Sequence, residues 1–175
     1  MLISRKVYLA PLCLGDVGKL FKWINQRRDV VFNSPYRPVT MSQHRKWYET
    51  VTRSRDIAIF GIHNKTGHGL IGVCQLHSIS HVHRSAELQI RIGDDEERGK
   101  GYGGEAVRLL VGFAFSDLNL ERVGLHVFST NKRALGLYAK TGFKVEGRLR
   151  KAAYIDGVYV DIILMGLMKD EWAHR

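Results

Sequence analysis

The sequence predicts a single α/β domain over residues 1–175, with a mixed, mostly antiparallel sheet of seven strands flanked by about four helices. Three observations predict this fold. Some apolar residues alternate with a period of two, others recur with a period near 3.6, and a glycine-rich loop joins a strand to a helix. The chain is long enough to bury a sizeable core within one domain.

The first part of the chain predicts one strand followed by two helices. Residues 7–9 have strand character, and Asp16 is a suitable N-cap for a helix whose apolar residues follow the 3.6-residue spacing. A loop containing two prolines follows over 33–38. Thr40 and Gln43 form a T-x-x-Q capping box, which predicts the start of a second helix.

The middle of the chain predicts a hairpin and a further strand. A β-rich run over 57–62 and a return strand over 70–76 are joined by a turn at 64–67. In the strand over 86–92, apolar and polar residues alternate, so the two kinds face opposite sides of the sheet.

The last part of the chain completes the order β-α-α-β-β-β-α-β-α-β-β. A helix follows the glycine-rich loop, and a strand covers 123–128. A shorter helix begins after Asn131 and stops at Gly142, because glycine suits the end of a helix. Asp156-Gly157 between two β-rich runs predicts a terminal hairpin. We expect one parallel crossover, from strand 86–92 to strand 123–128.

Composition and charge exclude several classes of protein. The net charge of +10 occurs in short clusters, which is typical of a solvated surface that attracts anions. Cys13 and Cys74 have no metal-type spacing and predict free thiols in a reducing, cytoplasmic compartment. Apolar runs are far shorter than the ~18 residues of a membrane span. We expect no metal site, because no complementary ligands accompany His77, His81 and His83.

The glycine-rich loop over 98–104 is the strongest functional motif. Glycines let backbone N–H groups approach a ligand, and the start of a helix adds donors and partial positive charge, so the loop predicts an anion site. It also satisfies G-x-G-x-x-G, but residues 94–98 separate it from the strand, which disfavours a dinucleotide-binding domain. A tight turn without a ligand is the alternative. We interpret the acidic run over 94–97 as solvated, directed away from the loop and offsetting the charges of Arg98 and Lys100.

Two patterns carry a resemblance to a protein family. Arg98, Gly101 and Gly103 match [Q/R]-x-x-G-x-[G/A], and residues 131–143 match N-x-x-A-x-x-L-Y-x-K-x-G-F. With these patterns the sequence resembles the GNAT acetyltransferase superfamily. Its tail is similar to the RimJ/RimL-like branch of ribosomal-protein, polyamine and amino-sugar acetyltransferases. The resemblance runs from about residue 7 to about residue 172 and implies an acetyl-CoA-dependent N-acetyltransferase.

The resemblance implies a site for acetyl-CoA as co-substrate. In the family the loop amides hold the pyrophosphate, the strand edge before the loop pairs with the pantetheine arm, and a backbone N–H near Ile92 polarises the thioester carbonyl. The implied cofactor residues are Ile90, Arg91, Ile92, Arg98, Gly99, Lys100, Gly101, Tyr102, Gly103, Gly104 and Asn131.

Acetyl transfer to an amine also needs a base and an acid. Only about 10⁻³ of an amine with a pKa near 10.4 is neutral at pH 7, and Glu87, on the strand that leads to the loop, is the candidate base. A surface carboxylate paired with Arg84 is the alternative. Tyr138 is the candidate acid, because a phenol stays protonated at pH 7 and can donate to the departing thiolate. Packing alone is the alternative for Tyr138.

Acceptor-binding side chains are expected from the first two helices and the loop between them. This region is rich in aromatic and cationic residues and poor in acids, which disfavours polyamines and aminoglycosides. We therefore expect an amino sugar or a protein N-terminus as the acceptor. The candidates are Trp23, Asn25 and Tyr36, with Arg27, Phe32, Arg37 and His44 nearby.

Two other functions are compatible with the sequence. The charge of +10 suits a nucleic-acid or ribosome-binding module, but no basic strip with interleaved aromatic residues is visible, so nucleic acid is disfavoured. A non-catalytic CoA-binding protein is disfavoured by the intact loop, Asn131 and Tyr138. No membrane partner is expected. A homodimer is compatible with this branch, and the terminal hairpin could supply an edge strand for it.

Overall fold

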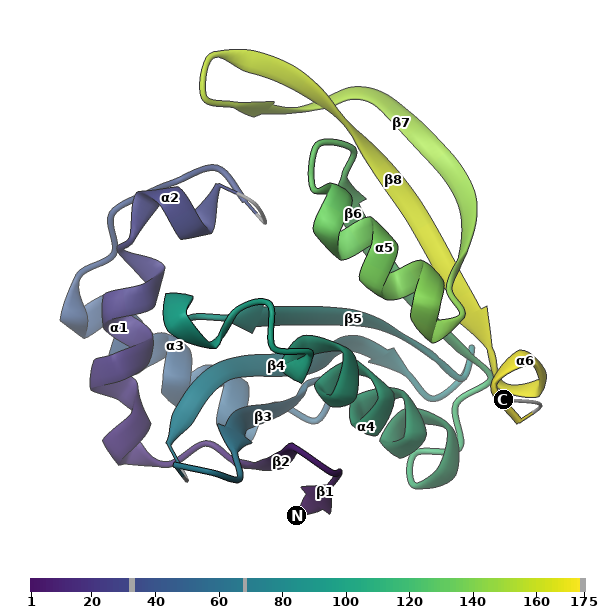
Figure 1. Cartoon of the computed structure of the whole chain (residues 1–175), viewed down its shortest axis with the longest axis horizontal. Helices are drawn as coiled ribbons and strands as arrows, with labels where there is room; N and C mark the ends of the chain where they lie inside the picture. Colours follow the sequence, from purple (N-terminus) through teal and green to yellow (C-terminus); the bar gives the residue numbers. More distant parts are fainter. Residues whose placement is uncertain (32–33, 68, 174–175) are drawn as a thin grey trace.

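The computed structural model describes residues 1–31, 34–67 and 69–173 and arranges them around one sheet with the strand order β1-β2-β3-β4-β5-β6-β8-β7 (Figure 1). The strands are β1 (Leu2–Ile3), β2 (Val7–Pro11), β3 (Ala58–Asn64), β4 (Leu70–Ser80), β5 (Ser85–Ile92), β6 (Arg122–Phe128), β7 (Lys144–Ile155) and β8 (Val158–Met168). The helices are α1 (Val17–Ile24), α2 (Arg27–Val30), α3 (Met41–Arg53), α4 (Tyr102–Ser116), α5 (Lys132–Thr141) and α6 (Lys169–Ala173).

The predicted α/β fold is confirmed, with additions at its margins. The sheet has eight strands among the described residues instead of seven, because the two-residue strand β1 pairs with β2. Helices α2 and α6, of 4 and 5 residues, are also additional. None of these three elements is long enough to show a hydrophobic period, so the sequence did not indicate them.

The sheet is antiparallel except for the predicted parallel pair, β5 and β6, which are connected through α4. These two strands pair only where Ser85–Glu87 faces Arg122–Gly124. Beyond Glu87 no strand of the described chain pairs with β5 on that side, although β4 still pairs with it as far as Ile92. The sheet therefore opens between β5 and β6.

Helices cover both faces of the sheet. The main core cluster includes residues of α4 and Tyr138 of α5. Cys74 belongs to this cluster, and Phe60 packs against it. Their strand neighbours Ile59 and Val73 pack instead against a second cluster, which includes residues of α1 and α3. Since successive residues of a strand point to opposite faces, α1 and α3 lie on the face opposite α4.

Local sequence signals predicted several of the helix ends correctly. The Thr40 box is present, with Thr40 N donating to Gln43 Oε1 at 2.9 Å. Helix α5 ends at Gly142, whose φ is 114°. The Asp16 prediction was wrong in its detail. The Asp16 carboxylate accepts from Cys13 N at 2.8 Å and closes the preceding 3-10 turn, and it makes no capping hydrogen bond to α1.

Candidate active site

The glycine-rich loop forms the N-terminal end of α4. Gly99 and Gly101 have φ of 87° and 88°, a left-handed conformation that residues with a Cβ rarely adopt. Gly101 is the N-cap residue, and no described side chain caps this helix. The amides of the first turn of α4 are thus left for a ligand, and the helix dipole makes the position favourable for an anion.

The two predicted basic residues of the loop are engaged with acids. Arg98 donates to the Ile92 carbonyl at 3.0 and 2.9 Å and pairs with Asp95 at 2.7 Å. Lys100 pairs with Glu97 at 3.0 Å, and its hydrogen bond lowers the pKa of that carboxyl. Both basic residues therefore shape the loop, and their charge is largely offset.

The acidic run offsets Arg98 and Lys100, as predicted, but it is not simply directed away into solvent. Asp95 pairs with Arg28 of α2 as well as with Arg98, and Asp94 lies 3.6 Å from Lys19 of α1. The run joins the loop to α1 and α2 through Asp94 and Asp95, whose carboxylates meet Lys19 and Arg28.

Two basic residues outside the predicted set lie close to the glycines. A Cβ placed on Gly101 would be 3.6 Å from Lys6 Nζ, and one placed on Gly99 would be 3.8 Å from Arg133 Nη2. Lys6 precedes β2 and Arg133 opens α5, so only the fold brings them to the loop. The sequence could have indicated Arg133, because it lies two residues after Asn131, which the resemblance places at the cofactor site.

The edge of β5 next to the loop contains the predicted pantetheine-binding residues Ile90, Arg91 and Ile92. On its β4 side this stretch is fully paired, from Cys74↔Ile90 to Gly72↔Ile92. On its β6 side it faces the opening of the sheet. An extended ligand could add to this edge as a strand would, since the backbone there points N–H and C=O groups into the opening.

Helix α5 lies beside the loop and holds the other two predicted residues. A Cβ at Gly103 would be 3.2 Å from Leu137 Cδ1. Asn131 is the N-cap of α5, and its Oδ1 accepts from Ala134 N at 3.1 Å. Tyr138 is 7% exposed, and its ring packs edge-on against Phe143. Burial raises the pKa of the Tyr138 phenol to about 12, so it is protonated at neutral pH.

Glu87 lies at the point where β5 and β6 separate. Its carboxylate is 4.0 Å from His77 Nε2 and 3.9 Å from His126 Nδ1. The alternative pairing with Arg84 is not observed, since Arg84 pairs with Glu121 at 2.8 Å. Sequence reasoning missed this cluster because its members come from three strands, β4, β5 and β6.

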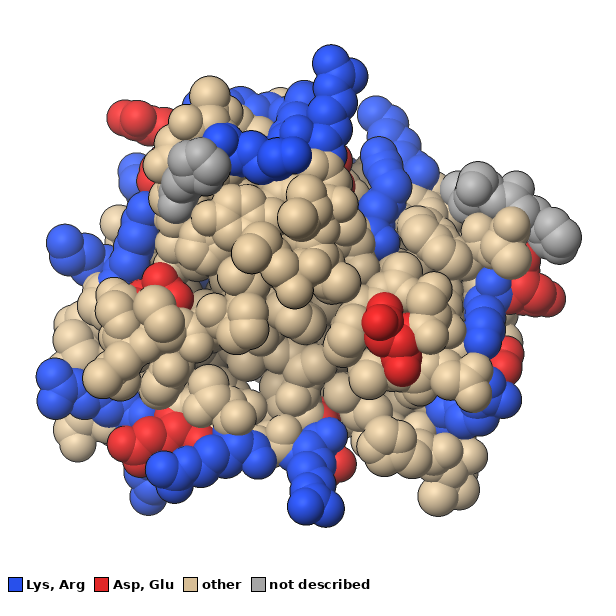
Figure 2. All heavy atoms as spheres, turned by 90° about the horizontal axis from the view of Figure 1, so that it is seen from below, with Lys and Arg blue, Asp and Glu red and all other residues tan. Residues whose placement is uncertain are grey.

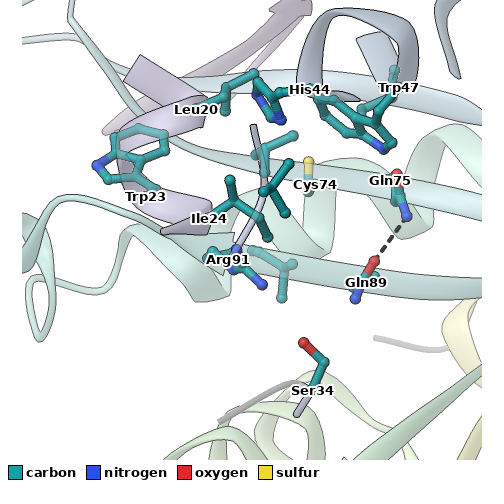
Figure 3. A pocket seen from close by; sticks show the side chains of 14 residues that line it. Leu20, Trp23, Ile24, Ser34, His44, Trp47, Cys74, Gln75, Gln89 and Arg91 are labelled. Carbon is teal, nitrogen blue, oxygen red and sulfur yellow. Dashed lines mark hydrogen bonds between the residues drawn. The ribbon is translucent and has the colours of Figure 1, made fainter. Parts of the chain in front are cut away.

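A cavity of about 370 Å³ lies on the face covered by α1 and α3 (Figure 3). Its walls include Leu20 of α1, Trp47 of α3 and the strand residues Ile59, Val73, Gln75 and Gln89. The three residues Gln89, Ile90 and Arg91 of β5 form one side of it. The cavity thus reaches the strand whose edge borders the opening of the sheet.

The predicted acceptor residues do not all meet at this cavity. Trp23 lines it, but its indole is 5% exposed and packs on Gly93. Asn25 is structural, because its amide bonds the backbone of Val39 in both directions at 2.9 Å. Tyr36 is half-buried and is not among the described lining residues. Phe32 lies outside the described residues. His44, expected only nearby, lines the cavity.

The described residues contain no group of three or more His, Cys, Asp or Glu that could hold a metal ion. None of the described helices is long and apolar enough to cross a membrane.

The sheet opening, the uncapped glycine-bordered helix and the mixed strand order define a GNAT-like α/β domain. The sequence model of the acetyltransferase (GNAT) domain family matches residues 6–144. The chain belongs to this family, and the family prediction made from the sequence is confirmed.

Two curated relatives and one solved structure show how far the similarity extends. The spermidine N(1)-acetyltransferase of Vibrio cholerae is 37% identical over 106 residues, which are 61% of this chain and 61% of the relative. That of Escherichia coli (strain K12) is 39% identical over 101 residues, 58% of this chain and 54% of the relative. The chain therefore matches little more than half the length of these curated relatives. The crystal structure of spermidine N-acetyltransferase from Vibrio cholerae in complex with CoA and spermine has a TM-score of 0.88 and 28% identity, covering 95% of this chain and 98% of that one.

Proposed function

We propose that the chain transfers an acetyl group from acetyl-CoA to a primary amine by direct attack of the amine on the thioester. The observation that carries the proposal is the opening of the sheet after Glu87, which lies between the glycine loop of α4 and the cavity under α1 and α3. A co-substrate on the loop side and an acceptor on the cavity side could meet there. Family membership supports the same reaction.

The residues present suit acetyl-CoA as co-substrate. The amides of Gly101–Gly104 would hold the pyrophosphate, with Lys6 and Arg133 adding positive charge beside it. The edge of β5 would pair with the pantetheine arm, and a backbone N–H near Ile92 would polarise the carbonyl. Acetyl-CoA supplies the acetyl group as an activated thioester.

We assign the catalytic roles to Glu87, where β5 and β6 separate, and to the buried Tyr138 of α5. Glu87 would take the proton from the amine, directly or through water, and the flanking imidazoles of His77 and His126 could pass it on. The amine nitrogen then bonds the carbonyl carbon, and the carbon–sulfur bond breaks. Tyr138 would donate its phenolic proton to the departing thiolate, and the proton that the nitrogen loses on forming the amide would restore the phenol through solvent.

Two classes of acceptor are supported by different observations. The names of the relatives favour a polyamine such as spermidine over the amino sugar or protein N-terminus expected from the sequence. The cavity favours an amine with an apolar substituent, since most of the described residues that line it are apolar or aromatic; Ser34, His44, Gln75, Gln89 and Arg91 are the polar ones.

A nucleic-acid-binding function is supported less well. Arg27, Arg28, Arg84, Arg122 and Arg148 each pair with a carboxylate. On the face in Figure 2, Lys and Arg lie mostly around the margin with Asp and Glu among them, and not in one strip. Such a dispersed pattern is a weak match for a phosphate backbone.

The proposal is tested by calorimetric titration of acetyl-CoA, followed by a thiol assay for CoA release with a panel of primary amines that includes spermidine. Acetyl-CoA binding together with turnover on one class of amine supports the proposal. Binding without turnover on any amine would indicate a CoA-binding protein, and absence of binding would overturn the assignment of the glycine loop.

A further inference from the structure

We infer that the cavity between α1, α3 and β3–β5 receives an uncharged apolar substituent of the acceptor, so that monoamines with an apolar chain or ring are preferred over polyamines. The inference rests on the proposed function and names the acceptor class of the same site.

The position of the cavity connects it to the reaction. Gln89 lines the cavity, and Glu87, two residues earlier on β5, points to the same face of the sheet. Two residues along a strand span roughly 7 Å, about the length of a short alkyl chain. A substituent held in the cavity would therefore leave its amine near Glu87.

The charges of the cavity oppose a second ammonium group. No Asp or Glu occurs among the described residues that line it, and Arg91 is the one charged side chain there. Burial lowers the pKa of His44, so its imidazole is neutral at pH 7 and offers no counter-ion. An ammonium group moved here from water loses solvation worth several kcal/mol without a carboxylate to offset it.

A cation–π contact with Trp47 does not change this balance. His44 stacks on the Trp47 ring at 4.8 Å and an interplanar angle of 18°, so one face of the indole is already covered. Contacts of this kind contribute about 0.5–2 kcal/mol, which is less than the desolvation of an ammonium group.

The polar groups of the cavity are either used within the protein or lack a partner. Gln75 donates to Gln89 at 2.8 Å, and Figure 3 shows this pair on one side with His44 and Trp47 above it. His44 is 5% exposed, and its Nε2 has no hydrogen-bond partner in the described chain. Besides the Arg91 cation and the Ser34 hydroxyl, the site thus offers apolar area and the neutral His44 nitrogen, which matches an uncharged substituent better than a second ammonium group.

A matched pair of acceptors tests the inference. Hexylamine and 1,5-diaminopentane have the same number of heavy atoms and differ in one terminal group, methyl against ammonium. We expect kcat/KM for hexylamine to exceed that for 1,5-diaminopentane at least tenfold at pH 7.5. Gln75→Glu places a carboxylate in the cavity with almost no change in shape, and it should shift the ratio at least tenfold toward the diamine. Ser42→Glu, which adds the same charge on the exposed side of α3, should leave the ratio unchanged.

Acetyl-CoA binding is measured on each variant by calorimetry, so a misfolded variant is recognised. If the wild-type chain uses the diamine or spermidine as well as or better than hexylamine, the inference is overturned and the proposed function stands. If Ser42→Glu shifts the ratio as much as Gln75→Glu, the selection comes from long-range charge and the inference is again overturned. If acetyl-CoA does not bind to the wild-type chain, the proposed function fails first.

Discussion

At the scale of single residues, burial decides which titratable groups can react. Tyr138 and Cys74 are both almost fully buried, and burial raises the pKa of each. For Tyr138 this keeps the proton on the phenol, as an acid requires. For Cys74 it keeps the thiol protonated and unreactive. The two effects have one cause, and each can be measured separately.

Replacing Tyr138 by Phe should lower kcat by about 10²-fold with little change in acetyl-CoA affinity, because only proton donation to the thiolate is removed. Steady-state kinetics and calorimetry check this. Wild-type turnover would leave Tyr138 with a packing role alone. Since its pKa is about 12, Tyr138 should also not cause any loss of activity between pH 7 and 10.

The same residue has a predicted effect on stability at high pH. The folded-state pKa of about 12 exceeds the unfolded value of about 10, so only the unfolded state ionises between these values. The contribution is fully present below pH 10 and is lost as pH rises toward 12. Urea unfolding at pH 9 and 11 should show a smaller decrease in unfolding free energy for Tyr138→Phe than for the wild type.

Glu87→Gln should lower kcat/KM by about 10²-fold or more at pH 7. The loss should shrink as pH approaches the pKa of the amine, since the acceptor then loses its proton to solvent. The matched control is Glu146→Gln, because Glu146 lines the same cavity of about 230 Å³ as Glu87 but is paired with Arg122. An equal, pH-independent loss in both variants would contradict the role of Glu87 as base.

The two cysteines should react differently with a thiol reagent. Cys13 is exposed, whereas Cys74 is 1% exposed. Native protein should therefore release about one equivalent of chromophore rapidly, and the second only after denaturation. If both thiols of the native wild type react rapidly, or if native Cys13→Ser still releases one equivalent rapidly, the strand around Cys74 opens readily.

At the scale of elements, most of the fold could be predicted because short-range signals specify it. The Thr40 box, the Gly142 helix end and the Asp156-Gly157 turn depend on neighbours in sequence. What could not be predicted depends on partners far along the chain. The acidic run meets cations from α1 and α2, Glu87 meets histidines from two other strands, and Asn25 bonds the loop at Val39. Residue types alone do not show such pairings.

A substitution in the glycine-rich loop tests whether the start of α4 binds acetyl-CoA. Gly101→Ala should weaken acetyl-CoA binding at least tenfold, because a Cβ is strained at φ of 88° by about 1–2 kcal/mol and the amides would be displaced. Gly112→Ala, later in α4, is the control, since its φ is not positive and no atom lies within 4 Å of the position of its Cβ. Equal affinity in the two variants would argue against binding of the pyrophosphate at this turn.

At the scale of the whole molecule, the β7–β8 hairpin projects beyond the rest of the sheet and reaches back toward α2 (Figure 1). Asp156 at its turn pairs with Arg27 of α2, so the hairpin and the first helices meet above the sheet. The outer strand β7 carries Arg148, Arg150 and Lys151 and has a register shift between Leu149 and Ala153. Charges and bulges of this kind block strand addition at an edge, so the hairpin is poorly suited to the edge-strand dimer that the sequence left open.

The exposed apolar residues of the hairpin favour self-association through the hairpin instead. Val145, Leu149, Tyr154, Val158 and Tyr159 are all at least 46% exposed, and exposed apolar groups gathered on one element mark association surfaces. We expect light scattering to report a homodimer or larger assembly, and Tyr154→Ser with Tyr159→Ser to shift it toward monomer. Val82→Ser, which removes an exposed apolar side chain from the β4–β5 turn, should not. A wild-type chain that stays monomeric at 100 µM would contradict the prediction, and the hairpin would then serve only to enclose the acceptor approach through its contact with α2.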